Sequence, residues 1–272
     1  MSYHSRGKLN QLQQLPDGAL VDAAWLEGHG YSSSLRHQYV KAGWLHQPAA
    51  RVYRRGNGPL TWQHAIISLQ NFLDLDLTIG GRTALEELGY GHYLGRTRKV
   101  HLYGPSKPPS WLAALPLDVS FQWHNSLRLF PADPESAAPP QPAGEPASML
   151  PGGFMATAGK LQWGMRLSSA ERALFQLLDE LPGQESFHQV DKLVEGLANL
   201  SPRKLQVQLA TCRSVKVKRL FFFFADRHRH SWLERIDRDQ VDLGQGKRVL
   251  VKGGKLDPTY LITVPGDLDG LS

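Results

Sequence analysis

The chain has 272 residues, of which 41% are hydrophobic and 21% charged, and it carries a formal net charge of +6. This composition is typical of an ordinary soluble globular protein with two or three domains. The single cysteine, Cys212, excludes an internal disulfide and a multi-cysteine zinc site, and we expect it to be a small core residue. No apolar run approaches the roughly 18 residues of a membrane-spanning helix, and the N-terminus lacks an apolar leader, so a cytoplasmic location is expected.

Residues 31–55 carry the most specific pattern. The serines at 32–34 suit a helix start, because their hydroxyls accept hydrogen bonds from unpaired backbone amides. Leu35 and Tyr39 give an apolar stripe, and Gly43 follows where a helix end favours glycine. An extended piece at 44–45, a wing tip at 46–50 and a strand-like return at 51–55 follow. With the preceding helix at 19–27, this order predicts a winged helix-turn-helix domain at 1–58.

A separate polar and basic stripe runs along the predicted second helix. Ser33, His37 and Lys41 recur every four residues, and Arg36 flanks them. Such a helix lies in the major groove of DNA, where Arg and His meet guanine edges and Ser and Lys hold phosphates. Residues 1–60 contain seven Lys or Arg against three acids, a local charge of +4. The alternatives are a solvated basic face and a winged helix that binds a protein.

The middle of the chain, residues 59–130, is predicted to be a mixed α/β segment. We expect a helix over 61–73, a strand over 75–79, a helix from 82 to about 89, and strands at 100–103 and 117–123. Residues 131–153 are rich in proline, alanine and glycine and contain no Lys or Arg. This composition predicts a linker or exposed loop.

Residues 154–272 are predicted to form a mainly helical domain that ends in a β-hairpin. A strand at 160–166 precedes a helix with a capping box at Ser168–Glu171. A second helix spans about 187–197, a third begins at Ser201 and Pro202, and a fourth follows the apolar spacing of 217–224. Within the last, Phe222 and Phe223 are expected to pack between domains. Residues 249–252 and 260–264 are expected to pair as the hairpin, so the fold class is α+β and multidomain.

Several other groups of residues resemble catalytic or ligand-binding sites, but a purely structural role explains them better. Asp74 and Asp76 share one face of a predicted strand, as in metal-dependent transferases, but lack a third acid, so an exposed strand face is favoured. Gly80 and Gly81 precede a helix and offer amides to an anion. They lack the spacing of a known phosphate-binding motif, so a tight turn is favoured. The sequence gives no positive case for an enzyme, a metal or a cofactor.

The C-terminal part is also basic, with 14 Lys or Arg against 5 acids in residues 201–255. His228 and His230 have no metal-binding spacing, so a solvated basic turn is favoured there. A solvated face and a functional patch explain the neighbouring basic cluster equally well. The cluster consists of Lys216, Lys218, Arg219, Arg227 and Arg229.

An ordered series of blocks resembles the AbiEi family of antitoxins and transcriptional regulators of type IV toxin–antitoxin systems. The blocks are AWLEGHGYSSSLRHQYVKAGWL, ARVYRRG, PLTWQHAIISLQ, LTIGGRTALEELGYGHYL and KVHLYGP. They span roughly residues 9–105. The segment from LSSAERALFQLLDELP onward resembles the family's antitoxin domain with a weaker signature.

The resemblance implies a non-enzymatic, bifunctional protein. The N-terminal winged helix would bind inverted repeats in double-stranded promoter DNA and repress its own operon. The C-terminal domain would neutralise AbiEii, a nucleotidyltransferase-like toxin, without a stable complex, and a membrane has no part in either role. The DNA-reading residues would be Ser32, Ser33, Ser34, Arg36, His37 and Lys41, with Arg51, Tyr53, Arg54 and Arg55 in the wing. The alternatives are a protein-interaction module and a general DNA-binding transcription factor without antitoxin activity.

Overall fold

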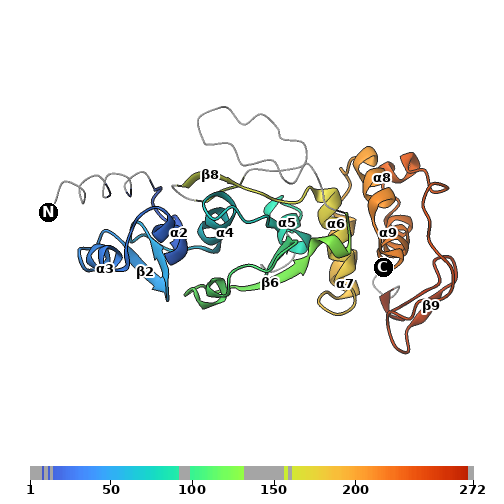
Figure 1. The fold of residues 1–272 in the computed structure, drawn as a ribbon. Coiled ribbons are helices and arrows are strands. Elements are labelled where there is room, and N and C mark those ends of the chain that lie inside the picture. Colours follow the sequence, from blue (N-terminus) through green and yellow to red (C-terminus); the bar gives the residue numbers. More distant parts are fainter. Residues whose placement is uncertain are drawn as a thin grey trace.

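The computed structural model describes residues 15–91, 99–131, 156–158 and 161–268, together with Lys8 and Leu12; at 156–158 and 161–163 it describes the backbone alone. The N-terminal, middle and C-terminal parts lie one after another along an elongated molecule, and residues 161–165 turn back along the middle part (Figure 1). Helices and small sheets alternate, and one continuous set of buried apolar side chains connects them, which agrees with the predicted α+β class. Within the described residues, no helix is long and apolar enough to cross a membrane.

The N-terminal part contains two short helices and a three-stranded antiparallel sheet. The elements are β1 (Leu20–Asp22), α2 (Ala23–Gly28), α3 (Ser33–Lys41), β2 (His46–Ala49) and β3 (Val52–Arg54), and β3 is the central strand. The helix predicted at 19–27 was therefore too long. Its first residues pair with β3, and the helix begins only where the Asp22 carboxylate accepts from the Trp25 amide at 2.8 Å.

The middle part is built on a second small sheet. Its elements are α4 (Trp62–Asn71), β4 (Thr78–Ile79), α5 (Gly81–Glu87), β5 (Lys99–Gly104) and β6 (Ser120–Asn125), with 3-10 turns at Ser110–Ala114 and Ser126–Arg128. β5 is antiparallel to β4 and parallel to β6. The strand predicted at 75–79 is shorter, because Asp74 adopts a left-handed φ of 49° in the turn after α4. The strand predicted at 117–123 begins later, where Ser120 pairs with Lys99.

A hairpin made by β7 (Ala156–Ala158) and β8 (Leu161–Met165) returns to the middle part, and Figure 1 shows β8 beside α4. The Gln70 side chain joins them, since its oxygen accepts from the Arg166 amide at 2.8 Å. Ile79 and Arg166 are also joined through their backbones, at 3.1 Å. The strand expected to open a separate C-terminal domain therefore packs on residues 59–130. The predicted linker, apart from Pro131, lies outside the described residues.

The four predicted C-terminal helices are present as α6 (Ala170–Asp179), α7 (Phe187–Glu195), α8 (Pro202–Thr211) and α9 (Val215–His228), followed by a 3-10 turn at Ser231–Arg235. α6 packs against both α5 and α9. The predicted capping box is wrong: Ser169 caps α6, and Glu171 instead accepts from the Ser201 amide at 2.9 Å, at the start of α8. Cys212 is buried, as predicted, at the end of α8.

The aromatic run of α9 packs within the C-terminal part. The Phe222 side chain is buried and stacks on Tyr260, with ring centroids 6.2 Å apart, so the prediction that it packs between domains is wrong. Phe223 makes an edge contact with Phe224 at 5.2 Å. Both contacts add to the C-terminal core.

The terminal hairpin exists, but its first strand is not the predicted one. β9 (Lys255–Asp257) pairs with β10 (Ile262–Val264). The Asp257 carboxylate accepts from the Tyr260 amide at 2.7 Å and so closes a tight turn between these strands. The predicted partner, residues 249–252, instead donates backbone amides of Leu250 and Val251 to the Thr263 hydroxyl.

Candidate functional site

The exposed face of α3 carries five of the ten positions predicted to read DNA. Ser32 caps the helix by accepting from the Leu35 amide at 3.3 Å, and Tyr39 is buried on the inner side. The outer side chains are Ser32, Ser33, Ser34, His37, Gln38 and Lys41, all exposed. Gln38 is absent from the predicted set, although its place four residues after Ser34 puts it on the same face.

Arg36 does not belong to this outer face. Its side chain is 6% exposed, and its guanidinium contacts Glu27 at 2.8 Å and donates to the Tyr31 carbonyl at 2.9 Å. It also lies over the Tyr53 ring at 5.9 Å. The prediction that Arg36 reads DNA therefore needs correction, because its charge is directed into the joint between α2, α3 and the hairpin.

The predicted wing residues divide in the same way. Arg51 is exposed in the turn between β2 and β3, with a left-handed φ of 62°. Arg54 is buried and donates to the Gly58 carbonyl, and burial lowers its pKa. Arg55 donates to the Leu15 carbonyl and pairs with Asp17 at 3.4 Å. Of the four wing candidates, Arg51 alone is exposed, and Tyr53, Arg54 and Arg55 support the hairpin.

The predicted basic surface of the C-terminal part does not form one patch. Arg219 is buried and donates to the carbonyls of Leu243 at 2.7 Å and Gly246 at 2.6 Å, so its place on a surface was wrong. Lys216 pairs with the Asp179 carboxylate at 3.2 Å.

The other members of the cluster also lie apart. Arg227 contacts Asp191 at 2.9 Å, and the Lys218 amine donates to the Asp242 carbonyl at 3.3 Å. Arg229, at the end of α9, is exposed. It lies 13 residues beyond Lys216, which is roughly 20 Å along a helix.

The histidines at 228 and 230 do not form a solvated turn. His228 Nε2 lies 2.8 Å from an Asp191 carboxylate oxygen, and His230 Nε2 lies 2.8 Å from the Val194 carbonyl. Both rings therefore tie the end of α9 to α7. Burial raises the pKa of the Asp191 carboxyl, but the His228 hydrogen bond and the Arg227 charge outweigh burial and leave this pKa lowered.

The two weaker candidates of the middle part are structural. Asp74 and Asp76 are exposed, as favoured, but in the loop after α4 rather than on a strand. The Gly81 amide donates to the Gln176 side-chain oxygen at 2.9 Å, so an internal partner stands where an anion would bind. A Cβ on Gly80 would lie 2.2 Å from that oxygen, so the close approach of the Gln176 side chain requires glycine at this position. This agrees with the tight turn that the sequence predicts at Gly80 and Gly81.

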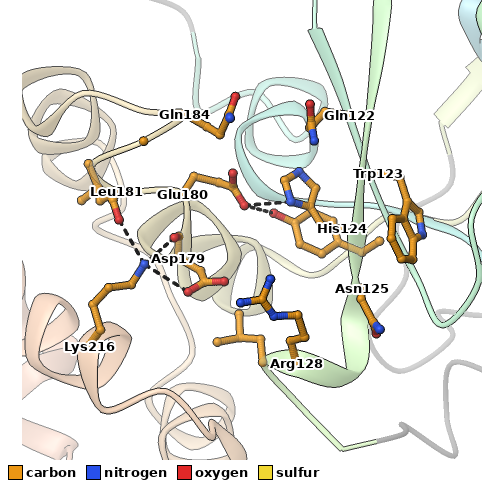
Figure 2. Close-up of a pocket in the computed structure, with 13 residues that line it drawn as sticks. Gln122, Trp123, His124, Asn125, Arg128, Asp179, Glu180, Leu181, Gln184 and Lys216 are labelled. Atoms are coloured by element: carbon orange, nitrogen blue, oxygen red, sulfur yellow. Dashed lines mark hydrogen bonds and ion pairs between the residues drawn. The ribbon is translucent and has the colours of Figure 1, made fainter.

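A pocket with a cavity volume of about 630 Å³ lies between β6 and the end of α6 (Figure 2). His124 enters it from β6, and its Nδ1 lies 3.0 Å from the Glu180 carboxylate. The other nitrogen of this ring, Nε2, lies 3.0 Å from Nδ1 of His101 on β5. Burial, the neighbouring His124 and the charges of Lys99 and Arg82 lower the pKa of His101 to about 3. The sequence reasoning missed this group, because its members are far apart in the chain.

Two family models match the chain. One is described as "Transcriptional regulator, AbiEi antitoxin N-terminal domain" and matches residues 5–96. The other is described as "Transcriptional regulator, AbiEi antitoxin, Type IV TA system" and matches residues 97–265. Among solved structures, the RV2827C protein from Mycobacterium tuberculosis is similar in fold. It has a TM-score of 0.53 and 14% identity over 90% of this chain and 86% of that one. No curated protein matches the chain.

Proposed function

Since the chain belongs to the AbiEi family of antitoxins and transcriptional regulators of type IV toxin–antitoxin systems, we propose that it represses its own promoter and neutralises an AbiEii-like toxin. Repression would depend on the N-terminal part and neutralisation on the C-terminal part. The main observation in support of DNA binding is the exposed polar and basic face of α3. The opposite, inner side of α3 contacts the β2–β3 hairpin through Arg36, which lies over the Tyr53 ring at 5.9 Å, and Arg51 is exposed at the turn of that hairpin.

We further propose that the N-terminal part is a winged helix-turn-helix, in which α2 and α3 are the two helices and the β2–β3 hairpin is the wing. In that arrangement α3 enters the major groove. His37 and Gln38 have side chains able to meet base edges, while Lys41 and the serines at 32–34 suit phosphates. Arg51 at the hairpin turn would follow the backbone into the neighbouring groove. Inverted repeats would place two copies of the chain on one operator.

For the toxin, the proposed counterpart is an AbiEii-like nucleotidyltransferase that is neutralised without a stable complex and without catalysis by this chain. The second family match, residues 97–265, supports assigning this role to the C-terminal part. In the predicted basic cluster Arg219 is buried, and the partly exposed Lys216 and Arg227 are paired with Asp179 and Asp191. The two other members are exposed Arg229 and partly exposed Lys218. They are the side chains of that cluster that we propose to contribute to neutralisation.

Separable variants test the proposal in cells. A reporter fused to the chain's own promoter measures repression, and growth during expression of the neighbouring toxin measures neutralisation. We expect the Lys41→Ala/Arg51→Ala variant to lose repression and keep protection, whereas Gln47→Ala, another exposed residue of the hairpin, should change neither. A chain that gives no repression and no protection would contradict the proposed function.

A second function, docking of a protein on the N-terminal part, has one observation in its favour. Trp44 follows α3 and is 41% exposed, next to the face proposed for DNA. Exposed aromatic side chains are enriched at protein interfaces. If Trp44→Ala abolished the pull-down of a partner while promoter binding stayed intact, this second function would be the correct one for that surface.

A further inference from the structure

A histidine pair and one carboxylate meet where the middle sheet joins the C-terminal helices. His101 lies on β5, His124 on the parallel neighbour β6, and Glu180 follows the last residue of α6. One ligand atom from each of these residues lies within 4.8 Å of the other two. Within the part of the chain that the structure describes, this is the one group of three His, Cys, Asp or Glu side chains that is close enough to hold a metal ion.

The distances suit a small divalent cation. Zinc binds imidazole nitrogen and carboxylate oxygen at roughly 2.0–2.2 Å in tetrahedral sites, which sets ligand atoms about 3.3 Å apart. His101 Nδ1 and His124 Nε2 are 3.0 Å apart, and His124 Nδ1 is 3.0 Å from Glu180 Oε1. These two contacts use different nitrogens of the His124 ring, and an ion would take only one of them. One ligand atom from each residue lies within 4.8 Å of the others, so the Glu180 or the His101 side chain would have to turn about the His124 ring for all three groups to meet one ion.

The surroundings keep the donors in place. The His101 amide donates to the Thr83 hydroxyl at 3.0 Å, and the Tyr103 ring stacks on His124 with centroids 4.6 Å apart. His101 is buried on β5. Imidazoles that packing already holds in place lose little freedom when an ion arrives.

Charged groups of both signs lie near the two imidazoles. Arg82 contacts the carboxylates of Glu86 at 2.8 Å and Glu185 at 3.4 Å, and the Lys99 amine donates to the Gln184 side chain at 3.0 Å. The Glu180 carboxylate contacts the His124 ring directly, so a divalent ion at this point would meet one negative ligand.

The pocket supplies the remaining coordination position. Figure 2 shows the Glu180 carboxylate and the His124 ring in contact at the wall of the hollow, with Gln122 and Gln184 nearby. Solvent can therefore reach the ion, and a water molecule can complete a site with three protein ligands.

We propose that His101, His124 and Glu180 bind a first-row transition-metal ion of the zinc type, and that this ion ties the β5–β6 sheet to the end of α6. The sequence-based expectation was that the chain holds no metal, because no two ligands stand at a recognisable spacing. The ion would brace the junction between the middle sheet and the C-terminal helices. It would thereby stabilise the part of the chain that matches the type IV antitoxin family model.

The experiment uses the full chain, stripped of metal with a chelator and then titrated with Co²⁺ and Zn²⁺. We expect one ion per chain, a visible absorption band of tetrahedral Co²⁺ that Zn²⁺ displaces, and a rise in the thermal unfolding midpoint. His124→Gln should abolish the band, and Glu180→Gln, which removes a charged ligand, should weaken binding by more than the roughly 10- to 100-fold that loss of a group hydrogen-bonded to a ligand costs. His37→Gln, which changes an exposed histidine on α3, is the matched control and should bind like the wild type.

Two results would overturn the proposal. One is a folded wild-type chain that shows neither the Co²⁺ band nor a thermal shift at millimolar metal. The other is unchanged stoichiometric binding in His124→Gln or in the His101→Gln/His124→Gln double variant, which would place the ion on other residues. Because the His124 side chain is 15% exposed, its single variant is expected to fold even if the double variant does not. Circular dichroism of each variant checks this.

Discussion

Arg36 is expected to stabilise the N-terminal part rather than to contact DNA. Its guanidinium donates to the Tyr31 carbonyl at 2.9 Å and contacts Glu27 at 2.8 Å. A buried hydrogen bond to a charged group contributes about 1.5–3 kcal/mol. The Glu27 side chain is 53% exposed and is rehydrated when its partner is lost, so the ion pair adds about 0.5–1 kcal/mol. Arg36→Ala should therefore lower the free energy of unfolding by about 2–4 kcal/mol.

Urea denaturation measures this loss, and hydrogen exchange of the α3 amides locates it. Lys41→Ala is the matched control, since Lys41 lies on the exposed side of the same helix. It should change stability by less than about 1 kcal/mol, the size of a charge–dipole interaction at a helix end. Under conditions in which Arg36→Ala is fully folded, it should bind promoter DNA like the wild type. If Arg36→Ala kept full stability and lost DNA binding as Lys41→Ala does, the buried placement of Arg36 would be refuted.

Three further predictions concern the packing of the rest of the chain. Arg219→Ala should lower the free energy of unfolding by about 3 kcal/mol, because two hydrogen bonds of the buried, charged guanidinium are lost. Chemical denaturation measures this loss, and a value below about 1 kcal/mol would argue against it. Gly80→Ala should cost about 1–3 kcal/mol, since its Cβ would clash with Gln176, and an unchanged thermal midpoint would contradict that close approach. The folded-state pKa of Asp191 is lowered, so its contact with His228 contributes stability above about pH 4 that is lost as the pH falls through the folded pKa. Asp191→Asn should therefore flatten the acid limb of a stability-against-pH curve, whereas Asp118→Asn, at an exposed position, should leave its shape unchanged.

Most helices of this fold could be predicted from the sequence, because the capping residues and apolar spacing that define a helix lie within the helix itself or next to it. Ser32, Ser169 and Ser201 cap the helices that the sequence assigned to them or to their neighbourhood. The strands were harder to place, since pairing depends on distant partners. Residues 20–22 form a strand because they pair with β3. Residues 249–252 are not the first strand of the terminal hairpin, because β9 is joined to β10 by a tight turn and pairs with it instead.

The candidate site shows the same limit at the level of side chains. The sequence predicts α3 and its polar stripe, but helical spacing alone does not show which side of the stripe faces the protein interior. Arg36 lies on the side that faces inward, and it is buried because α2 and the hairpin pack there. His101 and His124 are 23 positions apart and meet only through the parallel pairing of β5 and β6. No spacing rule within one segment could have paired them.

The proposed reading of DNA by α3 is tested most directly by the salt dependence of promoter binding. Fluorescence anisotropy with the chain's own promoter fragment should give tight binding that weakens steeply with salt. The Lys41→Ala/Arg51→Ala variant should bind more weakly, and its slope of log K against log salt should be shallower by about 2, since each lost phosphate contact removes about 0.9. An unchanged slope and affinity in this variant, or no binding by the wild type at low salt, would contradict the proposal.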